Sequence, residues 1–588
     1  MIKRTHTCGE LRITDAGKEV ALCGWINTSR DHGGLIFIDL RDRYGITQIV
    51  FDQSTCGDFY ETAKKLGYED VIGIKGIVRK RPEDTINPNL ETGEIEVVVK
   101  ELEVYNESKP LPFMVTDRST ALENLRLKYR YLDLRTKEMQ RNIILRHKAA
   151  QSVREYYNNN GFLEIETPFL MKSTPEGARD FLVPSRLHRG KFYALPQSPQ
   201  MFKQILMIAG FDKYYQIVKC FRDEDLRSDR QPEFTQIDVE MSFVEETDVI
   251  NSTEQMIKKV FKDTVGYEFT EKFPIITYEE AMRRYGTDSP DIRFGLELKE
   301  VSKLFLETDF NVFKNIINEE KGSVVGLCIP DSMELTRMEI DRTVELVKQW
   351  GGRGLAWTRF TENGFEGGIG KFISPIKDSI LKTLNAKQGS ILLFIGDTKY
   401  KPYELMGMLR VYIADKLKIP KSDKFKAVWV VNFPLLEWDD DEKRYKAVHH
   451  PFTAPRPEDI ELLDTDPEKV RSRAYDIIIN GTEIGGGSIR NHRVDVQKKV
   501  FKVLGISEEE AQEKFGFLLE ALSFGAPPHG GIALGFDRLV MLLAGEDSLR
   551  DIIAFPKTKN GISPMDGSPT EVNEEQLKEL GIKIVRYE

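Results

Sequence analysis

The sequence predicts a multidomain α+β protein: an N-terminal β-barrel, a larger domain with an antiparallel sheet flanked by helices, and an α+β domain inserted into the larger one. Short strand-like runs separated by Gly, Asp and Asn turns fill residues 20–104. Helical and strand-like patterns mix from about residue 137, and they change character between 290 and 424. The 588 residues are enough for several domains of about 100–200 residues each.

The first domain is expected to span residues 1–107. Its strand-like runs are EVALCGWI, LIFIDLRD, ITQIVFD, VIGIKGIVRKR and EIEVVVKELEV. Five short strands in about a hundred residues are typical of a small barrel, of which the OB-fold is one candidate. Pro110 and Pro112 then indicate a linker, which we assign to 108–135.

A basic stretch at 126–148 overlaps this linker and the helix predicted from about 137 to 159. It contains eight Lys or Arg residues against Asp133 and Glu138. Two interpretations stay open: a solvated helix face, or a surface that follows a phosphate backbone.

The larger domain is expected in two parts, 136–289 and 425–556, around the insertion at 290–424 and before a C-terminal extension at 557–588. The segment GFLEIETPFL reads as a strand ending at Pro168, and another helix is predicted near 247–263. YYQIVKCF and FTQIDVEMSF flank a charged loop of about a dozen residues, which predicts an antiparallel hairpin.

The second strand of that hairpin alternates strictly in polarity. The period of two predicts that one face packs on a core and the other is polar. A row of an amide and carboxylates favours the floor of a polar cleft, although a half-exposed strand is a fair alternative. The apolar face carries Ile237, Val239, Met241 and Phe243, and the polar face carries Gln236, Asp238, Glu240 and Ser242.

Composition excludes several classes of protein. No apolar run approaches the roughly 20 residues of a membrane span, and the start lacks the apolar stretch of a signal peptide. The five cysteines lie far apart without a CxxC pair, so neither a disulfide framework nor a zinc site is expected. We expect a cytoplasmic protein. With a net charge of −10, any nucleic acid must be held by local patches.

Two segments have the chemistry of a nucleotide site. In the charged loop, Arg222 suits a phosphate, Glu224 suits an exocyclic amine and Phe234 can stack on a base, although a surface ion-pair loop is the alternative. In GGIALGFDR, Gly535 allows a sharp turn and Asp537–Arg538 open an apolar helix, whose N-terminus favours anions. No P-loop follows the glycines.

Other residues are ambiguous taken singly. Asp476 and Glu483 lie near opposite ends of a hairpin-like segment and provide the hard oxygen ligands that magnesium prefers. Lys203 lies on a predicted helix, where a lone lysine is usually a snorkelling surface residue. His449 and His450 could be acid–base groups or metal ligands, but paired histidines in a loop are more often neither.

In combination and in this order, the motifs resemble class II aminoacyl-tRNA synthetases, specifically the bacterial-type aspartyl-tRNA synthetases. GFLEIETP, CFRDED–RQPEFTQID and GGIALGFDR are similar to the three class motifs. TPEGARDF, ALPQSPQ, HHPFT and GTEIGGGSIR are similar to the aspartyl subfamily. The resemblance spans essentially the whole chain, with an OB-fold domain and an inserted GAD domain at 290–424.

The resemblance implies an ATP-dependent, AMP-forming aspartate–tRNA ligase with ATP as substrate and Mg²⁺ as cofactor. Arg222 and Arg538 would be catalytic, with Arg538 and Phe234 sandwiching the adenine. Asp476 and Glu483 would carry Mg²⁺. The implied ATP-binding residues are Arg222, Asp223, Glu224, Gln231, Phe234, Glu483, Gly535, Phe536, Asp537 and Arg538.

The same resemblance implies an aspartate pocket in which Lys203 and Arg490 bind the side-chain carboxylate. Glu176 and Gln200 would bind the ammonium, and His449 would close over the site. An asparagine amide would then leave two buried cations uncompensated, at a cost of several kcal/mol. The full implied set is Glu176, Ser198, Gln200, Lys203, Arg222, Asp238, His449 and Arg490.

The implied partners are L-aspartate, tRNA-Asp and a second copy of the chain, since motif 1 builds a dimer interface in this class; no membrane is implied. The barrel would read the anticodon through Arg30, Phe37, Gln48 and Glu94. Whether tRNA-Asn is also charged is left open. His32 is typical of tolerant members of the family, whereas Asp84 matches neither tolerant nor strict ones.

Three alternatives compete with this interpretation. Asparaginyl and lysyl enzymes share the general plan, but the insertion and the Lys203–Arg490 pair argue against them. An ammonia-dependent asparagine synthetase uses the same catalytic fold without an OB domain. A non-catalytic RNA-binding paralogue would be expected to lack Arg222, Glu483 or Arg538, and all three are present.

Overall fold

The computed structural model describes residues 1–173, 178–318, 321–330 and 335–585. The chain divides into two compact units. The first comprises residues 1–144 with 554–558 and 562–569, and the second comprises 145–553 with 559–561 and 570–588. Each unit is described by itself.

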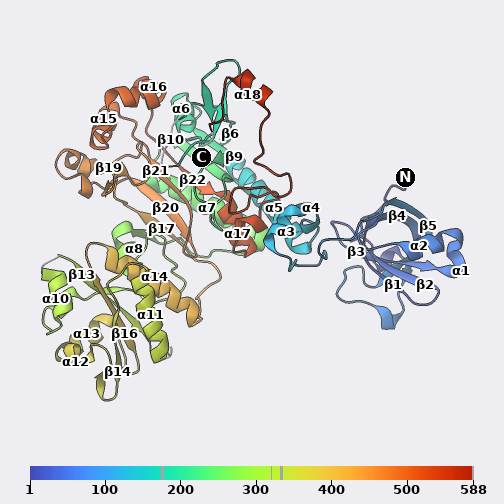
Figure 1. Ribbon diagram of the computed structural model, residues 1–588, viewed down its shortest axis with the longest axis horizontal. Coiled ribbons are helices and arrows are strands. Elements are labelled where there is room, and N and C mark those ends of the chain that lie inside the picture. The colour runs from blue at the N-terminus through green and yellow to red at the C-terminus, as the bar shows by residue number, and fades with distance from the viewer. Residues whose placement is uncertain (174–177, 319–320, 331–334, 586–588) are drawn as a thin grey trace. The chain divides into compact units, whose positions relative to one another are not determined.

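A closed five-stranded barrel forms most of the first unit, as the strand pattern predicts (Figure 1). The hydrogen-bonded order is β1-β2-β3-β5-β4. Along β2, Ile36, Ile38 and Leu40 enter the core, which leaves Phe37 and Asp39 outside. The strands are β1 (Glu19–Asp31), β2 (Leu35–Arg41), β3 (Ile46–Asp52), β4 (Val71–Lys80) and β5 (Ile95–Asn106); helices α1 (Gln53–Cys56), α2 (Tyr60–Lys65), α3 (Glu123–Lys128) and α4 (Arg130–Asp133) complete the unit with the start of α5.

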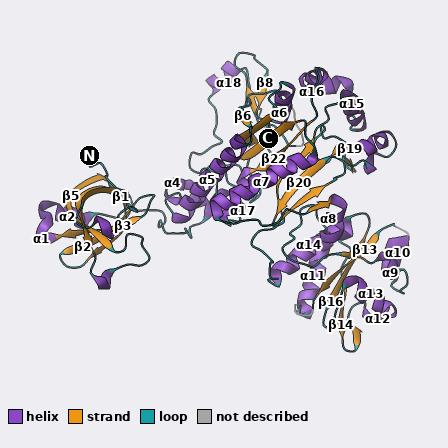
Figure 2. Cartoon of the chain, turned by 180° about the vertical axis from the view of Figure 1, so that it is seen from behind, coloured by secondary structure: helices purple, strands orange, loops and turns teal. Residues whose placement is uncertain are grey.

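An eight-stranded sheet dominates the second unit (Figure 2). Its order is β11-β17-β20-β21-β22-β10-β9-β6, so strands distant in sequence pair at its centre. Helices α5 (Lys137–Asn159), α7 (Glu246–Val265) and α17 (Phe536–Ala544) share one hydrophobic core with this sheet. The strands are β6 (Leu163–Glu164), β9 (Lys213–Phe221), β10 (Glu233–Ser242), β11 (Ile275–Thr277), β17 (Ala427–Val431), β20 (Ala474–Ile479), β21 (Thr482–Ile489) and β22 (His529–Gly535).

Strand β10 has the predicted alternation with one exception. Ile237, Val239 and Met241 lie in the helix-packed core, and β10 pairs antiparallel with β9 as expected for the hairpin. Phe243 was expected on the same apolar face, and that expectation is wrong. The strand ends at Ser242, and Phe243 turns out with a left-handed φ of 57° and 75% exposure.

A separate five-stranded sheet lies within residues 299–397, in the order β12-β13-β16-β14-β15. Its entry and exit segments are adjacent, because Ser422 N donates to Arg293 O at 2.8 Å. The elements here are β12 (Lys299–Glu300), α9 (Ser302–Phe305), α10 (Asn311–Asn318), β13 (Ser323–Ile329), α11 (Arg337–Gln349), β14 (Ala356–Thr361), β15 (Gly364–Glu366), α12 (Gly370–Ile373), α13 (Lys377–Leu384), β16 (Ile391–Asp397) and α14 (Lys401–Lys416).

The other elements surround the large sheet. They are β7 (Leu182–Pro184), β8 (Phe192–Ala194), α6 (Gln200–Ile208), α8 (Tyr278–Tyr285), β18 (Leu436–Asp439), β19 (Arg444–Ala447), α15 (Val494–Val503), α16 (Glu508–Ser523) and α18 (Glu574–Leu580). All five cysteines are free thiols. Among the described residues, no helix combines the length and apolar content required to span a bilayer.

Candidate active site and the outer face of the barrel

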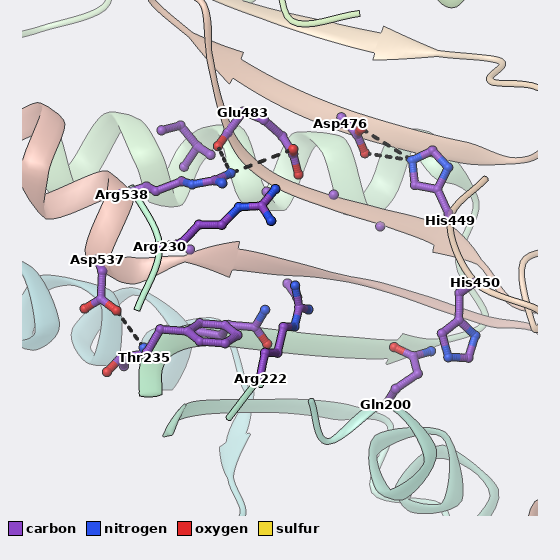
Figure 3. A pocket seen from close by; sticks show the side chains of 18 of the residues that line it. Gln200, Arg222, Arg230, Thr235, His449, His450, Asp476, Glu483, Asp537 and Arg538 are labelled. Atoms are coloured by element: carbon purple, nitrogen blue, oxygen red, sulfur yellow. Dashed lines mark hydrogen bonds and ion pairs between the residues drawn. The ribbon is translucent and has the colours of Figure 1, made fainter. Parts of the chain in front are cut away.

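A cavity of about 490 Å³ opens on the polar face of the large sheet (Figure 3). β10, β21 and β22 form its floor, and α6, the loop after β9 and the start of α17 contribute to its walls. Small residues keep the floor open. A Cβ on Gly486 would lie 2.3 Å from Oδ1 of Asp476, which lines the cavity. The predicted residues that line the cavity are Gln200, Lys203, Arg222, Glu224, Gln231, Phe234, His449, Asp476, Glu483, Arg490, Gly535, Asp537 and Arg538.

One end of the cavity is a slot bounded by an aromatic ring and two arginines. The Arg222 guanidinium carbon lies 5.1 Å from the centre of the Phe234 ring. Among the described residues, Arg222 Nε is buried without a hydrogen-bond partner, as expected of a group that awaits an acceptor. Arg538 approaches from α17, where Nη1 donates to Glu483 O at 3.1 Å.

Asp537 holds the start of α17 against the hairpin. Its Oδ2 accepts from Thr235 N at 2.7 Å, and its Oδ1 accepts from Arg146 Nη1 at 2.6 Å. The carboxylate was expected to bind ATP. It is instead 3% exposed and fully engaged with the protein, so its role in the structure is to position Arg538 beside Phe234.

The opposite wall carries the two carboxylates expected to bind magnesium. Asp476 and Glu483 face the cavity from β20 and β21. Burial and the neighbouring Asp476 charge raise the pKa of Glu483. Within the described residues, no three His, Cys, Asp or Glu side chains cluster as a metal site. Two crowded like charges beside a phosphate-sized space fit a cation that is completed by substrate and water.

His449 contacts Asp476, with Nε2 at 3.2 Å from Oδ1. Burial lowers the pKa of His449, but the Asp476 carboxylate more than offsets this effect, and the net pKa is raised. The ring also packs edge-on against Phe433, 4.6 Å between centroids. His450, which the sequence left unassigned, also lines the cavity (Figure 3).

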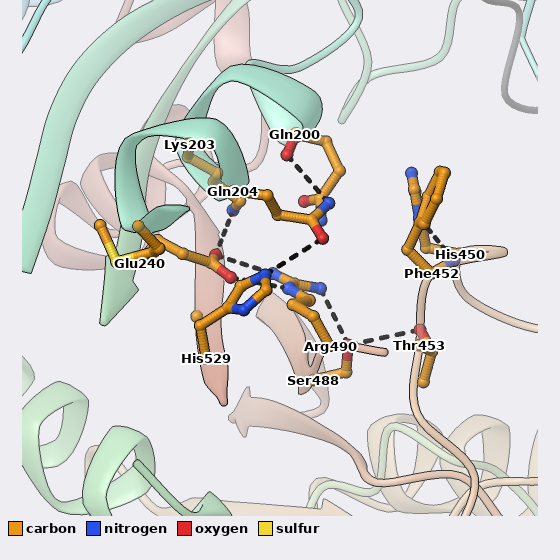
Figure 4. A network of polar contacts seen from close by, with 12 residues as sticks. Gln200, Lys203, Gln204, Glu240, His450, Phe452, Thr453, Ser488, Arg490 and His529 are labelled. Atoms are coloured by element: carbon orange, nitrogen blue, oxygen red, sulfur yellow. Dashed lines mark hydrogen bonds and ion pairs between the residues drawn. The ribbon is translucent and has the colours of Figure 1, made fainter. Parts of the chain in front are cut away.

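At the floor, Lys203 and Arg490 form a buried charge cluster with two carboxylates of β10 (Figure 4). Lys203 Nζ lies 2.7 Å from Asp238 Oδ1 and 3.4 Å from Glu240 Oε2. Arg490 donates to Glu240 from Nε at 3.0 Å and from Nη2 at 3.2 Å. Lys203 is 1% exposed, which excludes the snorkelling alternative.

This cluster corrects the charge argument made from the sequence. Two cations already face two carboxylates, so asparagine would not leave Lys203 and Arg490 uncompensated. Selection of aspartate over asparagine must instead depend on how the carboxylate of the substrate competes with Asp238 and Glu240 for Lys203 and Arg490. Burial raises the pKa of Asp238 despite Lys203, and its Oδ2 has no partner among the described residues.

Glu240 was expected on the polar face of β10 but was not assigned to the aspartate pocket. Its place on the polar face of β10 was visible in the alternation, but its bidentate contact with Arg490, 250 residues away, was not. Two further side chains support the cluster: Ser488 Oγ accepts from Arg490 Nη1 at 2.8 Å, and His529 Nε2 lies 3.3 Å from Gln204 Oε1.

Three of the predicted site residues lie outside the cavity lining, and a fourth lies outside the described residues. Phe536 is 2% exposed and packs in the hydrophobic core, so its ring does not reach a nucleotide. Asp223 is half-exposed and pairs with Arg179 at 3.7 Å. Ser198 lines a separate small pocket with Gln197. Glu176 lies outside the described residues.

The expected anticodon residues gather on the outer face of the barrel, within the first unit. Phe37 contacts the His32 ring edge-on at 5.7 Å. Arg30 Nη2 donates to Gln48 Oε1 at 3.3 Å, and Gln48 Nε2 donates to Glu96 Oε2 at 2.8 Å. Glu94 is exposed and lies outside this network, whose carboxylate is Glu96, the next residue on the same face of the strand. Asp84 is exposed in a short turn.

The basic stretch at 126–148 proves to be partly internal. Arg130 is 2% exposed and pairs with Asp133, which also accepts from Arg126 at 2.9 Å. Arg135 pairs with Glu69 at 2.8 Å, and Arg146 binds Asp537. Several of these cations therefore form ion pairs within the protein. The basic stretch is not one continuous surface that could follow a phosphate backbone.

The fold and cavity define a class of protein. The chain belongs to the class II tRNA synthetases: residues 122–559 match the family described as tRNA synthetases class II (D, K and N), and residues 20–105 match the OB-fold nucleic acid binding domain.

Among its relatives are proteins named aspartate–tRNA(Asp/Asn) ligase. The one from Caldanaerobacter subterraneus subsp. tengcongensis is 54% identical over 99% of this chain and 98% of the relative. The one from Aquifex aeolicus is 53% identical over the same shares. A solved asparaginyl-tRNA synthetase from Pyrococcus horikoshii, at 20% identity, covers 95% of this chain and 99% of that chain with a TM-score of 0.59, which shows the shared fold.

Proposed function

We propose that the chain is an aspartate–tRNA ligase that activates L-aspartate with ATP and transfers it to the 3′ end of tRNA. The observation that carries the proposal is the buried Lys203–Arg490 pair at the floor of a cavity whose other walls suit a nucleotide. Both cations line the cavity, where a substrate carboxylate can compete with Asp238 and Glu240 for their N–H donors. The names of relatives at 51–54% identity support the same reaction.

In the first step, the aspartate α-carboxylate attacks the α-phosphorus of ATP and pyrophosphate leaves. Arg222 and Arg538 stabilise the charge that develops on phosphate oxygens, and Phe234 orients the adenine. Asp476 and Glu483 would hold Mg²⁺, which supplies charge neutralisation at the phosphates when bound. In the second step, the 3′-hydroxyl of the terminal adenosine attacks the activated carbonyl and AMP leaves.

The domain assignment belongs to the same proposal. Residues 1–107 serve as the anticodon domain and 108–135 as the hinge; 136–289 and 425–556 are the catalytic parts, 290–424 is the GAD domain and 557–588 the extension. Two copies form a homodimer through motif 1, and the protein acts in the cytoplasm.

We propose further that both tRNA-Asp and tRNA-Asn are substrates. His32 lies beside Phe37 on the barrel, and the named relatives carry both tRNAs in their names. The strict enzyme that charges only tRNA-Asp is the competing reading, because Asp84 does not match the tolerant pattern.

The test is aspartate charging of tRNA-Asp and tRNA-Asn transcripts side by side with the purified protein. We expect both reactions to reach a plateau. Charging of tRNA-Asp alone would make the enzyme strict, and charging of neither, without aspartate-dependent pyrophosphate exchange, would refute the ligase assignment.

A further inference from the structure

A second recess of about 730 Å³ lies on the barrel, separate from the anticodon residues. Its floor includes Cys23, Trp25 and Tyr105, and its rim carries Lys3, Arg4, Arg43 and Tyr44 among the residues that line it. The three cations are exposed, and Tyr44 is 53% exposed. This cluster has no part in the function proposed above.

The cationic rim is held rigidly in place. Segments 4–10 and 42–45 pack backbone to backbone, since a Cβ on Gly9 would lie 2.2 Å from Tyr44 O and one on Gly45 2.7 Å from the Gly9 Cα. Asp42 ties the two segments together by accepting from Cys8 N at 2.9 Å and Tyr44 N at 2.8 Å. Arg4 and Arg43 are therefore held near one ring.

The two arginines of the rim differ in their surroundings, since Arg4 pairs with Asp42 whereas Arg43 packs against Tyr44. The Arg43 guanidinium lies 4.5 Å from the centre of the Tyr44 ring and that of Arg4 lies 5.9 Å away. The acids nearby are committed to the protein: Asp42 to the backbone and to Arg4 at 3.6 Å, and Glu103 to Ile2 N at 2.6 Å. Arg43 Nη2 donates to the Tyr44 hydroxyl at 2.6 Å, and a guanidinium with five N–H donors can bind a phosphate through the others.

The recess and the anticodon residues share one face of one strand pair. Trp25 pairs with Arg41 at one end of β1–β2, and Arg30 pairs with Phe37 towards the other. A bulge between Ile26 and Thr28 shifts the alternation, so that Trp25 and Arg30 both lie outside the barrel core. Six residues from Phe37 to Arg43 correspond to about 20 Å.

We propose that this recess binds the sugar-phosphate backbone of the same tRNA whose loop lies on Phe37, with Arg4 and Arg43 on phosphates and Tyr44 against a ribose or base. This inference rests on the proposed function. In a chain with a net charge of −10, such a local cluster supplies attraction that the whole molecule does not.

The test compares an Arg4→Ala/Arg43→Ala variant with a charge-matched control, Lys18→Ala/Lys100→Ala, whose exposed lysines lie on the barrel outside the recess. We expect the recess variant to raise the KM for tRNA about tenfold. The slope of log KM against log salt should fall by about two, one for each lost phosphate contact. Aspartate-dependent pyrophosphate exchange should stay unchanged, and Arg4→Lys/Arg43→Lys should recover most of the affinity.

An unchanged KM for tRNA, or an equal rise in the control variant, would overturn the inference. Because pyrophosphate exchange needs no tRNA, its absence in the unmodified protein would instead refute the proposed function. Binding of an isolated anticodon stem-loop, weakened by both the recess variant and Phe37→Ala, would support one RNA that spans both places. Weakening by Phe37→Ala alone would count against it.

Discussion

Lys203 Nζ is buried within 3.4 Å of two carboxylates, so replacing this residue affects both the proposed substrate contact and the charge cluster beneath it. We expect Lys203→Met to reduce aspartate-dependent pyrophosphate exchange by at least a hundredfold. The variant removes the proposed substrate contact and takes the ion-pair partner Lys203 away from Asp238, and breaking a buried pair costs about 3–5 kcal/mol. Near-normal exchange in a folded variant would refute the assignment of the aspartate pocket.

Gly486 is a second position where a small substitution, the addition of one Cβ, is expected to change the site. It lies opposite Asp476 in the β20–β21 ladder, and a Cβ there would lie 2.3 Å from Asp476 Oδ1. We expect Gly486→Ala to displace this carboxylate, lower exchange at least tenfold and raise the magnesium concentration needed for half-maximal rate. Gly295→Ala, where a Cβ meets nothing within 4 Å, is the control and should be neutral. An unchanged magnesium dependence would contradict a metal-binding role for Asp476.

At the scale of elements, the nucleotide slot depends on how α17 meets the β9–β10 hairpin. Asp537 makes that junction through Thr235 N and Arg146. We expect Asp537→Ala to destabilise the protein by about 3 kcal/mol, because it leaves a buried donor and an arginine without an acceptor. Urea unfolding measures the free energy of unfolding, and a separate assay of aspartate-dependent pyrophosphate exchange measures the activity. Asp537→Asn keeps one acceptor oxygen and should lower the free energy of unfolding less than Asp537→Ala. Equal decreases in the two variants would show that the hydrogen bonds of Asp537 do not stabilise the protein.

The elements show where sequence reasoning succeeds. Helix α5 begins and ends at the predicted residues, and the β9–β10 hairpin follows from two alternating runs around a charged loop. Local periodicity determines such features. The polar face of β10 was predicted for the same reason. Its ion pairs were not, because Lys203 and Arg490 lie 35 and 250 residues from their partners Asp238 and Glu240, and no local pattern contains such contacts.

The errors have equally physical causes. Phe243 fits the alternation but follows the strand end, where the left-handed backbone breaks the period. Phe536 and Asp537 lie in a motif whose neighbour Arg538 faces the cavity, yet successive helical residues point in different directions, so one enters the core and one anchors the hairpin. The hydrogen bond from Gln48 to Glu96 also escaped the sequence reasoning, whereas the anticodon role of Glu94 stays a prediction.

At the scale of the whole molecule, the inserted sheet can be tested as a separable part. Ser422 N donates to Arg293 O, and Arg293 Nη1 reaches Lys424 O at 3.4 Å, so a short linker can join the two ends. We expect replacement of residues 294–421 by a Gly/Ser linker to leave pyrophosphate exchange within about threefold. Stability should fall, because α14 packs on Gly286 at the end of α8. Loss of exchange with intact secondary structure would assign the insertion a direct part in activation.

The central position of β22 has a consequence for synthesis of the chain. This strand lies between β10 and β21, both of which precede it in the chain and therefore leave the ribosome earlier. At a translation rate of about 5–20 residues per second, roughly 15–60 s pass between the synthesis of β10 and that of β22. During that interval the nascent chain carries an unpaired strand edge in what will become the middle of its sheet, which is a hazard for aggregation. The slot proposed for the nucleotide contains both Phe234 and Arg538, so it is complete only after α17 has been made.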